Sequence, residues 1–391
     1  MLSLDSFERL TRHGTPFYYY DISLLRRTLD LLAEQAGRYG IKVHYAVKAN
    51  SERRILKMIA EAGFGVDAVS ANEIVHALSC GFAASDVMFA GVGKTDHEIR
   101  TALQAGIGCF NVESLCEMDA IESIAAEMGV TAPVALRINP NIDPHTHKYI
   151  TTGMEDNKFG ISSYEFADAA AKVRECSHLK LTGLQFHIGS QITDVENVFS
   201  LESKCAREIT EYFESLGVKI EHIDFGGGLG VDYDDPDGQP VADFESWLKA
   251  VRKYFPDDCG YELHVEPGRA LVAQCASLIT SVVFVKETRT KTFIITDAGM
   301  NDLIRPALYG AYHKIDNLSA FYQRGDEDAS CVYDVVGPVC ESSDTWGEGR
   351  LLQKSSRGDI LAIRTAGAYG QTMASRYNLR DLAPAVYSDE L

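Results

Sequence analysis

The sequence predicts an α/β fold, a (β/α)₈ TIM-like barrel followed by a C-terminal, mainly β domain. Eight short apolar runs typical of strands alternate with amphipathic runs typical of helices, and after about Leu271 this alternation stops. Strands that alternate with helices indicate βαβ units with right-handed crossovers. Eight such units fill the roughly 250 residues of a closed barrel. An open, doubly wound sheet has the same local pattern and is the alternative.

The predicted barrel strands are short, and most lack alternation of apolar and polar residues, as expected for parallel strands covered on both faces. They are Val43–Val47, Val66–Val69, Val87–Ala90, Cys109–Val112, Val134–Ile138, Leu184–Ile188, His222–Phe225 and Glu262–Val265.

Helices are predicted before the first strand and between the others. Asn50-Ser51 is a start signal for one of them, and glycines such as Gly106 and Gly129 are stop signals. The predicted helices are Leu24–Tyr39, Ser51–Ala62, Ala71–Cys80, His97–Ala105, Ser114–Met128, Tyr164–Cys176, Leu201–Leu216 and Phe244–Phe255.

The C-terminal third has strand-like runs without long helices between them. We assign residues 24–275 to the barrel and 276–391 to a β domain, which residues 1–23 complete through Tyr18-Tyr19-Tyr20. The predicted strands of this domain are Ser277–Lys286, Thr292–Thr296, Ser330–Val336 and Asp359–Thr365.

Composition excludes several classes of protein. The formal charge of −19 argues against a surface for nucleic acid or an anionic membrane, which would need clustered Lys and Arg. The N-terminus lacks the features of a signal peptide, and no apolar stretch is long enough for a membrane span. The nine cysteines are scattered without a CxxC pair, which favours reduced thiols in the cytoplasm and no metal site.

Reactive groups of such barrels lie where the strands end, at the C-terminal face. A lysine, a histidine, a glycine run and carboxylates on different strands therefore converge on one mouth. These strand-end residues are Lys48, Asp67, Arg137, His187, Gly226–Gly228 and Glu266.

Each of these residues has an ordinary structural interpretation when it is taken alone. Lys48 can be a solvent-facing lysine or a desolvated amine that forms a Schiff base. The Gly226–Gly230 segment can be a tight turn or a phosphate cradle. His187 can be a rim residue, and Glu266 can form an ion pair with Arg269. Together they are the groups that bind pyridoxal phosphate.

At this point the chain resembles a known family. The order and identity of six motifs are similar to the diaminopimelate decarboxylases, fold type III enzymes related to alanine racemase and to ornithine and arginine decarboxylases. The motifs run through nearly the whole chain: Tyr45-Ala46-Val47-Lys48-Ala49-Asn50, His187-Ile188-Gly189-Ser190-Gln191, Gly226-Gly227-Gly228-Leu229-Gly230, Glu266-Pro267-Gly268-Arg269, Cys340-Glu341-Ser342-Ser343-Asp344 and Gly367-Ala368-Tyr369-Gly370.

The resemblance implies a carboxy-lyase that uses pyridoxal 5'-phosphate to convert meso-2,6-diaminopimelate to L-lysine and CO₂, the last step of lysine biosynthesis. It also implies a homodimer whose active sites are shared across the interface. Lys48 would be the Schiff-base lysine, His187 would stack on the pyridine ring, and Glu266 would pair with its nitrogen. Phosphate binding would fall to Ser190, Gly227, Gly228, Glu266, Pro267, Gly268, Arg269 and Tyr369.

The same resemblance assigns the substrate. Arg269, Arg305, Tyr309 and Tyr369 would bind it, and Cys340 and Glu341 of the partner subunit would act as proton donor and as ligand for the distal amino-acid end. Guanidinium groups suit the two carboxylates of diaminopimelate, whereas ornithine would leave one arginine unpaired. Asp67 and Arg137 are expected either to support the cofactor or to form structural ion pairs. The chain is short for the family, which suggests trimmed loops in the β domain.

Three alternatives remain open from the sequence. A related enzyme could act on D-ornithine, D-lysine or carboxynorspermidine with the same cofactor. A racemase would need a second base and a pyridine partner other than a carboxylate, so Glu266 argues against it. A non-catalytic, regulatory relative should have lost Lys48, Cys340 or the phosphate glycines, and all of them are present.

Overall fold

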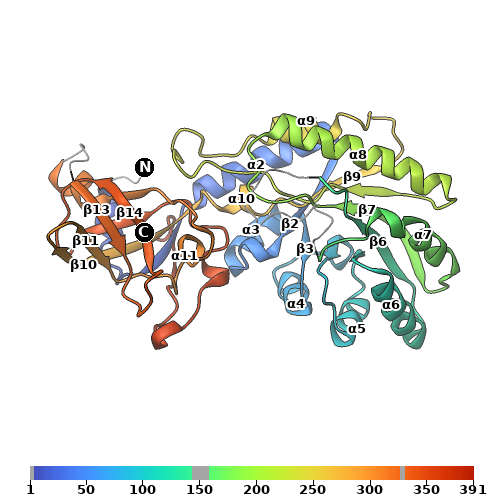
Figure 1. The fold of residues 1–391 in the computed structure, drawn as a ribbon, viewed down its shortest axis with the longest axis horizontal. Coiled ribbons are helices and arrows are strands. Elements are labelled where there is room, and N and C mark those ends of the chain that lie inside the picture. The colour runs from blue at the N-terminus through green and yellow to red at the C-terminus, as the bar shows by residue number, and fades with distance from the viewer. Residues whose placement is uncertain (1–3, 143–157, 326–330) are drawn as a thin grey trace. The chain divides into compact units, whose positions relative to one another are not determined.

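The fold is that of a computed structural model, which describes residues 4–142, 158–325 and 331–391. The chain divides into two compact units (Figure 1). We call Leu29–Gly230 with Asp243–Gly268 the barrel unit. Met1–Thr28, Val231–Ala242 and Arg269–Leu391 form the second unit, here called the β unit.

The barrel unit is a closed barrel of eight parallel strands, so the predicted barrel is confirmed and the open-sheet alternative is wrong. Each strand pairs with the next, and the last pairs with the first in the register Val43 to Val265. In order the strands are β2 (Ile41–Ala46), β3 (Gly65–Ala68), β4 (Val87–Phe89), β5 (Cys109–Val112), β6 (Ala132–Ile138), β7 (Leu179–Phe186), β8 (His222–Asp224) and β9 (Glu262–Val265).

Helices cover the outside of this barrel (Figure 1). Gly106 and Gly129 end their helices in the left-handed conformation, as the sequence predicts, because glycine adopts positive φ without strain. The helix after β2 begins later than the Asn50-Ser51 signal, since Glu52 is its N-cap. The helices are α2 (Ile22–Tyr39), α3 (Arg53–Glu61), α4 (Ala71–Ser79), α5 (Asp96–Ala105), α6 (Leu115–Met128), α7 (Phe166–Glu175), α8 (Val195–Ser215) and α9 (Phe244–Arg252).

A cluster of three histidines lies at the end of the barrel where the strands begin. The rings of His222 and His264 are stacked with centroids 4.7 Å apart, and His44 lies 4.9 Å from His264. Glycine is required on the neighbouring strands, because a Cβ at Gly65 or Gly183 would overlap the ring of His44 or His222. We call these three residues the histidine floor.

The β unit is built on an eight-stranded sheet whose main path is β12-β15-β10-β11-β13-β14. The N-terminal strand that contains Tyr18-Tyr19-Tyr20 pairs with β10 and β16 and so belongs to this sheet. Its strands are β1 (Phe17–Tyr20), β10 (Ala276–Glu287), β11 (Thr292–Thr296), β12 (Ile315–Asn317), β13 (Cys331–Val336), β14 (Thr345–Leu352), β15 (Ile360–Ile363) and β16 (Ala385–Tyr387).

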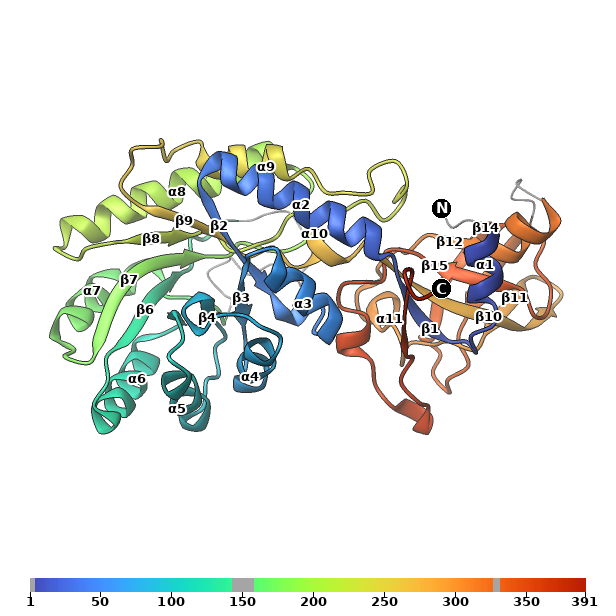
Figure 2. The same ribbon diagram turned by 180° about the vertical axis from the view of Figure 1, so that it is seen from behind.

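Short helices complete the β unit. α1 (Leu4–Leu10) lies beside the sheet (Figure 2), where Phe7 and Leu10 share a buried cluster with Ile279 and Leu318. The other helices are α10 (Arg269–Val272) and α11 (Arg305–Tyr309). The sequence analysis missed β12, β14 and β16, and Ser330, the first residue of one predicted strand, lies outside the described residues.

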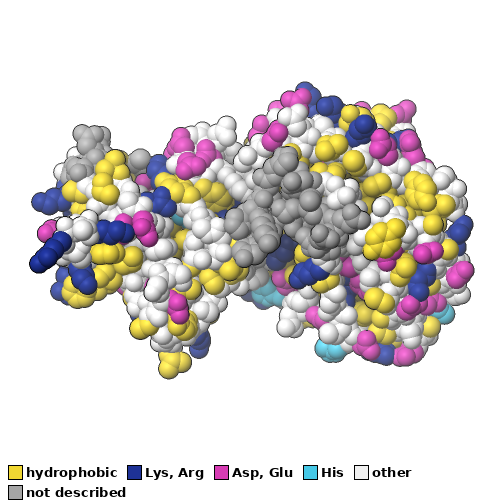
Figure 3. Space-filling model, in the orientation of Figure 1, with side chains coloured by type: hydrophobic (Ala, Val, Ile, Leu, Met, Phe, Trp, Pro, Cys, Tyr) yellow, Lys and Arg dark blue, Asp and Glu magenta, His cyan; other side chains and the backbone are white. Residues whose placement is uncertain are grey.

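Charged side chains are interspersed on the face shown in Figure 3, where Asp and Glu mix with Lys and Arg along the barrel helices. Among the described helices, none combines the length and apolar character that a bilayer crossing requires. All nine cysteines are free.

Candidate active site

Lys48 lies in a single 3-10 turn, Val47–Ala49, directly after β2. Its Nζ donates to Oδ2 of Asp67, at the end of β3, over 3.1 Å. The lysine side chain is 40% exposed and the aspartate 1%. The amine therefore faces the open side of the barrel mouth, and a buried carboxylate holds it from below. This ion pair gives Asp67 the supporting contact to Lys48 that the sequence left open.

Glu266 follows β9 and is held by two amides inside the barrel. The side chain of Asn111 donates to its Oε1 over 3.2 Å, and Gln185 donates to its Oε2 over 3.0 Å. Asn111 lies on β5 and Gln185 on β7, and neither strand pairs with β9, so both amides reach the carboxyl group from other sides of the barrel. The Glu266 side chain is buried and cannot swing toward solvent.

The environment of Glu266 favours a proton or a nearby cation. Burial raises its pKa well above the ordinary value for a carboxyl group, and the charges of Asp224 and Asp67 raise it further. The charges of Lys48 and Arg137 act in the opposite direction. A ligand that brings an N⁺–H donor to Glu266 would relieve this excess of negative charge.

His187 follows β7 and presents a neutral ring. Its Nδ1 accepts a hydrogen bond from the backbone N–H of Gly227 over 3.2 Å, which leaves Nε2 to carry the ring proton. Burial lowers the pKa of His187 well below its usual value, and the charges of Lys48 and Arg137 lower it further. A half-buried, uncharged imidazole of this kind can stack on a flat aromatic ligand.

The glycine run after β8 brings backbone close to backbone. A Cβ at Gly226 would overlap the carbonyl of Phe186, and one at Gly227 would overlap the carbonyl of Glu266. At Gly228, φ is +111° and a Cβ would lie 2.7 Å from the carbonyl of Gly189. Side chains are therefore excluded from the turn, as a cradle for a phosphate group requires.

Ser190, Pro267 and Gly268 belong to the same barrel unit. Ser190 is half-buried in the turn after β7, and Pro267 and Gly268 are buried directly after Glu266. A Cβ at Gly268 would lie 3.0 Å from Ala49, next to Lys48, so only glycine fits there without displacement.

Arg137 forms a buried ion pair. Its Nη1 donates to Oε1 of Glu113 over 2.6 Å, and both side chains are less than 10% exposed, at 8% and 2%. Glu113 also accepts the backbone N–H groups of Gly91 and Gly160. Arg137 thus anchors loops around the mouth, in agreement with the structural alternative, while its charge still reaches His187 and Glu266.

In the β unit, Arg269 and Arg305 meet around one tyrosine. The guanidinium of Arg269 donates to the Tyr233 hydroxyl over 2.6 Å, and that of Arg305 lies 4.7 Å from the centre of the same ring. Arg269 also lies over the ring of Tyr369 at 5.0 Å. Both arginines are buried, so two desolvated cations lie side by side.

A neutral histidine orients Arg305. The Nη1 of Arg305 donates to Nε2 of His313 over 2.8 Å, and Nδ1 of that ring bonds the carbonyl of Arg364 over 2.8 Å. Burial lowers the pKa of His313 to about 3, so Nε2 keeps its lone pair. Within the described part of the chain no carboxylate pairs with Arg305, and burial lowers its pKa with help from the charge of Arg269. A substrate carboxylate would satisfy this cation.

The remaining predicted substrate residues are also in the β unit. Tyr309 ends α11 and is half-buried, whereas Cys340 and Glu341 are exposed. The backbone N–H of Cys340 bonds Oδ1 of Asn378 over 3.1 Å, and the Tyr377 hydroxyl donates to Glu341 over 3.5 Å. Their exposure leaves both side chains accessible to a second molecule.

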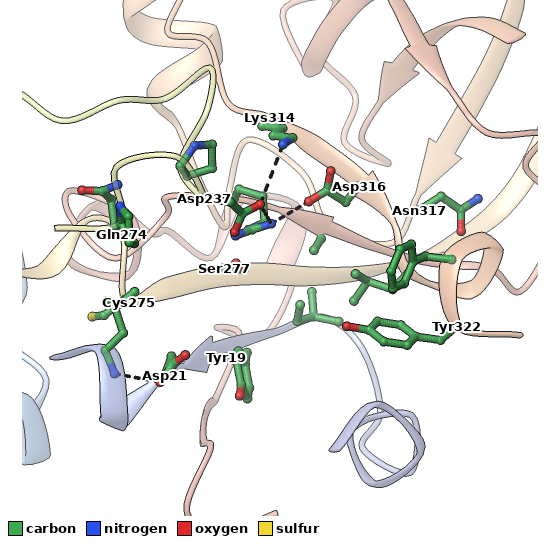
Figure 4. A pocket seen from close by; sticks show the side chains of 18 of the residues that line it. Tyr19, Asp21, Asp237, Gln274, Cys275, Ser277, Lys314, Asp316, Asn317 and Tyr322 are labelled. Carbon is green, nitrogen blue, oxygen red and sulfur yellow. Dashed lines mark hydrogen bonds and ion pairs between the residues drawn. The ribbon is translucent and has the colours of Figure 1, made fainter. Parts of the chain in front are cut away.

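A separate cavity of about 720 Å³ lies within the β unit (Figure 4). Its charged groups pair with one another: Lys314 with Asp237 at 3.8 Å, and Arg364 with Asp316 at 2.7 Å. Tyr322 contributes to an aromatic wall. None of the predicted site residues lines this cavity.

Sequence reasoning missed five polar residues that complete the side-chain clusters around Glu266 in the barrel unit and around Arg305 in the β unit. The residues are Asn111, Gln185, Asp224, Tyr233 and His313. Asn111, Gln185 and Asp224 interrupt apolar runs, and that interruption is the signal that could have found them, whereas Tyr233 and His313 lie in polar stretches without such a signal.

Comparisons with known proteins agree with the motifs. The family model for the pyridoxal-binding domain of pyridoxal-dependent decarboxylases matches residues 23–273. The diaminopimelate decarboxylase of Bacteroides thetaiotaomicron is 46% identical over 99% of this chain and 98% of its own length. That of Neisseria meningitidis serogroup B is 42% identical over 96% of this chain and 88% of its own.

A solved structure extends the similarity to three dimensions. Diaminopimelate decarboxylase from Helicobacter pylori, complexed with L-lysine, superimposes with a TM-score of 0.90 at 37% identity. The match covers 97% of this chain and 93% of the other.

Proposed function

Because this chain belongs to the diaminopimelate decarboxylase family of pyridoxal-dependent enzymes, we propose that it converts meso-2,6-diaminopimelate to L-lysine and CO₂, the last step of lysine biosynthesis. The observation that carries the proposal is the barrel mouth. An accessible amine, a neutral imidazole and a buried, acceptor-rich carboxyl layer act on one another there.

The residues present fit pyridoxal 5'-phosphate. When bound, this cofactor supplies an electron-accepting ring for the electron pair that departing CO₂ leaves behind. Lys48 would attach it through Nζ, and His187 would stack against it. The phosphate would be held by Ser190, Gly227, Gly228, Pro267, Gly268, Arg269 and Tyr369, and Glu266 would meet the ring nitrogen.

Glu266 strengthens the electron sink. Its carboxylate would accept a hydrogen bond from the protonated ring nitrogen, and the amides of Asn111 and Gln185 hold that carboxylate in one orientation. An acceptor that is preorganised in this way needs no reorganisation when charge develops. This role also favours decarboxylation over racemisation, for which a weaker electron sink is suitable.

Substrate binding falls to the two arginines and their neighbours. Arg269 and Arg305 bind carboxylate groups, Tyr309 and Tyr369 border the substrate, and Glu341 of the partner subunit binds the distal ammonium. The support is the buried, histidine-oriented guanidinium of Arg305, which lacks a carboxylate partner among the described residues. A substrate without a distal carboxylate would leave that cation unsatisfied.

Cys340 of the partner subunit completes the reaction. The bond between the α-carbon and the carboxylate breaks, CO₂ leaves, and the electron pair on the α-carbon takes the proton of the Cys340 thiol. The exposure of Cys340 in this chain is compatible with a role at another subunit's site. The enzyme is accordingly a homodimer with shared sites, and its free cysteines suit the cytoplasm.

A substrate panel tests the proposal. Purified protein with added pyridoxal phosphate is given meso-diaminopimelate, D-ornithine, D-lysine, carboxynorspermidine, L-ornithine and L-arginine, and CO₂ release is measured. We expect release from meso-diaminopimelate alone. Preferred turnover of another amino acid would contradict the assigned roles of Arg305 and Glu341, and a yellow protein that turns over nothing would favour a regulatory relative.

A further inference from the structure

The side chains of Asp67, Asn111, Gln185, Asp224 and Glu266 form a buried polar layer beneath the barrel mouth. This layer has more hydrogen-bond acceptors than donors. Four buried oxygens in it have no donor among residues 4–142, 158–325 and 331–391: Oδ1 of Asp67, Oδ1 of Asn111, Oε1 of Gln185 and Oδ2 of Asp224. A buried acceptor without a donor is costly, so native structures rarely keep several together. The layer therefore needs at least one proton beyond those that its amides and Lys48 supply.

Asp224 differs from the other aspartate of this layer in its donor: Asp224 accepts from a backbone N–H, whereas Asp67 accepts from the amine of Lys48. Asp224 is fully buried at the end of β8. Its Oδ1 accepts the backbone N–H of Gly226 over 2.8 Å, which fixes the start of the glycine run. Its other oxygen, Oδ2, has no donor among the described residues, and the carboxyl group of Glu266, which follows the paired strand β9, is close enough to be its hydrogen-bond partner. Two carboxyl groups can form such a bond only if one of them is protonated.

We propose that Asp224 is a positioning residue for Glu266, and that the two carboxyl groups share one proton, which lies between Oδ2 of Asp224 and the Glu266 carboxylate. The shared proton holds Glu266 in place and leaves the pair with a single negative charge. That charge is the partner of the ring nitrogen, a part of the inference that rests on the proposed function. The proton itself belongs to the protein and is present without cofactor.

The charges around the pair support this sharing. Burial raises the pKa of Asp224, and the charge of Asp67 raises it further, while the N–H of Gly226 lowers it. Other groups act on the pair from the elements packed around it. They are Lys48 after β2, Cys109 on β5, Arg137 on β6 and Glu202 on α8. The two cations oppose protonation of Glu266, but one is paired with Asp67 and the other with Glu113.

If Asp224 only held the Gly226 turn in place, its carboxyl group would not need to share a proton. Holding the N–H of Gly226 needs only one acceptor oxygen, which asparagine also has. Asp224→Asn therefore keeps the turn and removes the shareable proton site. Glu266→Gln removes the other half of the pair and keeps its shape. Glu202→Gln is the matched control, because Glu202 is also fully buried, neither of its carboxyl oxygens has a donor among the described residues, and burial raises its pKa well above the ordinary value.

Infrared spectroscopy of the cofactor-free protein reads the proton directly. A protonated carboxyl group has a C=O stretch separate from the carboxylate band. We expect the wild type to show such a band at neutral pH, and both Asp224→Asn and Glu266→Gln to lose this same band. Glu202→Gln should lose a different one. The proposed proton sharing would be overturned if the C=O band of the protonated carboxyl group persisted in Asp224→Asn or in Glu266→Gln, or if the wild type lacked it.

A second measurement, on Asp224→Asn alone, tests the positioning role if Glu266→Gln does not fold. In the loaded enzyme, Asp224→Asn should move the pH dependence of the cofactor absorbance and of kcat by about one pH unit or more, with KM little changed. An unmoved pH profile would overturn the positioning role. The infrared result does not depend on turnover, so failure of the proposed function leaves it intact and the two failures are distinguishable.

Discussion

Nζ of Lys48 lies 3.1 Å from the buried Oδ2 of Asp67, so the one amine at the end of β2 is held at the barrel mouth by a carboxylate from the neighbouring strand. The pairing of β2 with β3 sets this distance, since Ala46 and Asp67 are partners in the register. The ion pair fixes the orientation of the lysine, whose side chain remains 40% exposed and therefore accessible to a ligand. A lysine that merely reached for solvent would not need a buried partner.

Lys48→Ala should abolish both the yellow absorbance of the bound cofactor and CO₂ release, because no other residue supplies the attaching amine in the proposed mechanism. Absorption spectra and CO₂ assays of the purified variant measure the two effects. Lys42→Ala is the control: Lys42 lies on the same strand, 60% exposed, and its ion pair with Glu262 is at the surface. Full activity of the Lys48 variant would refute the role.

Arg305→Met should weaken the discrimination between diaminopimelate and D-lysine. The substitution keeps an unbranched side chain and removes the buried cation for which we propose a substrate carboxylate as partner. We expect kcat/KM for diaminopimelate to fall by about 10–100-fold, mainly through KM. Arg357→Met serves as control, because that guanidinium stacks on Phe284 in the same unit, away from Tyr233. Unchanged kinetics of the Arg305 variant would remove it from the substrate site.

A mixing experiment tests whether Cys340 acts across subunits. Lys48→Ala and Cys340→Ala homodimers should each be inactive, but a mixed dimer has one site with both residues intact. Random reassociation of equal amounts should therefore restore about a quarter of the wild-type activity. If the two residues served the same site from one chain, mixing would restore nothing.

The histidine floor should make the protein less stable in acid. Burial and the neighbouring His44 lower the pKa of His222 to about 4, and burial also lowers the pKa values of His44 and His264. A histidine that is neutral in the folded state but has a pKa near 6.5 when unfolded takes up protons on unfolding. Stability is therefore full above about pH 6.5 and falls as the pH drops toward 4, with His222 contributing up to about 3 kcal/mol.

Urea unfolding between pH 7.5 and 5 measures this slope. His222→Asn should flatten it relative to the wild type, while His97→Asn, at an exposed position on α5, should leave it unchanged. An equal slope in the wild type and the His222 variant would mean that another group unfolds the protein in acid.

The sequence predicts the barrel and its mouth well because both follow from local patterns. Apolar runs reveal the strands, and the first polar residue after a run, such as Lys48 or His187, lies at the mouth. Asn111 and Gln185 were not predicted because they lie inside strands. Which residues of a strand face the barrel interior is decided only when the barrel closes. The role of both amides depends on Glu266, far away in the chain, and single-strand patterns do not report such partners.

The β unit was harder to predict for the same reason. β12 and β16 have three residues each, too few to give a periodic pattern, and they exist because β15 and β1 offer them hydrogen bonds. Arg305 was named by resemblance, but its orientation by His313 and Tyr233 depends on segments that meet only in the folded chain. Local sequence also misplaced the start of α3 by one residue, because the side chain of Glu52, and not that of Ser51, accepts the first N–H groups of the helix.

The most direct test of the central claim is the product balance from meso-diaminopimelate. Purified enzyme loaded with pyridoxal phosphate is incubated with this substrate, and CO₂ and L-lysine are quantified together. We predict equimolar amounts of both products, with neither formed by Lys48→Ala. CO₂ without L-lysine, or substrate that is only racemised or left unchanged by the loaded enzyme, would contradict the account.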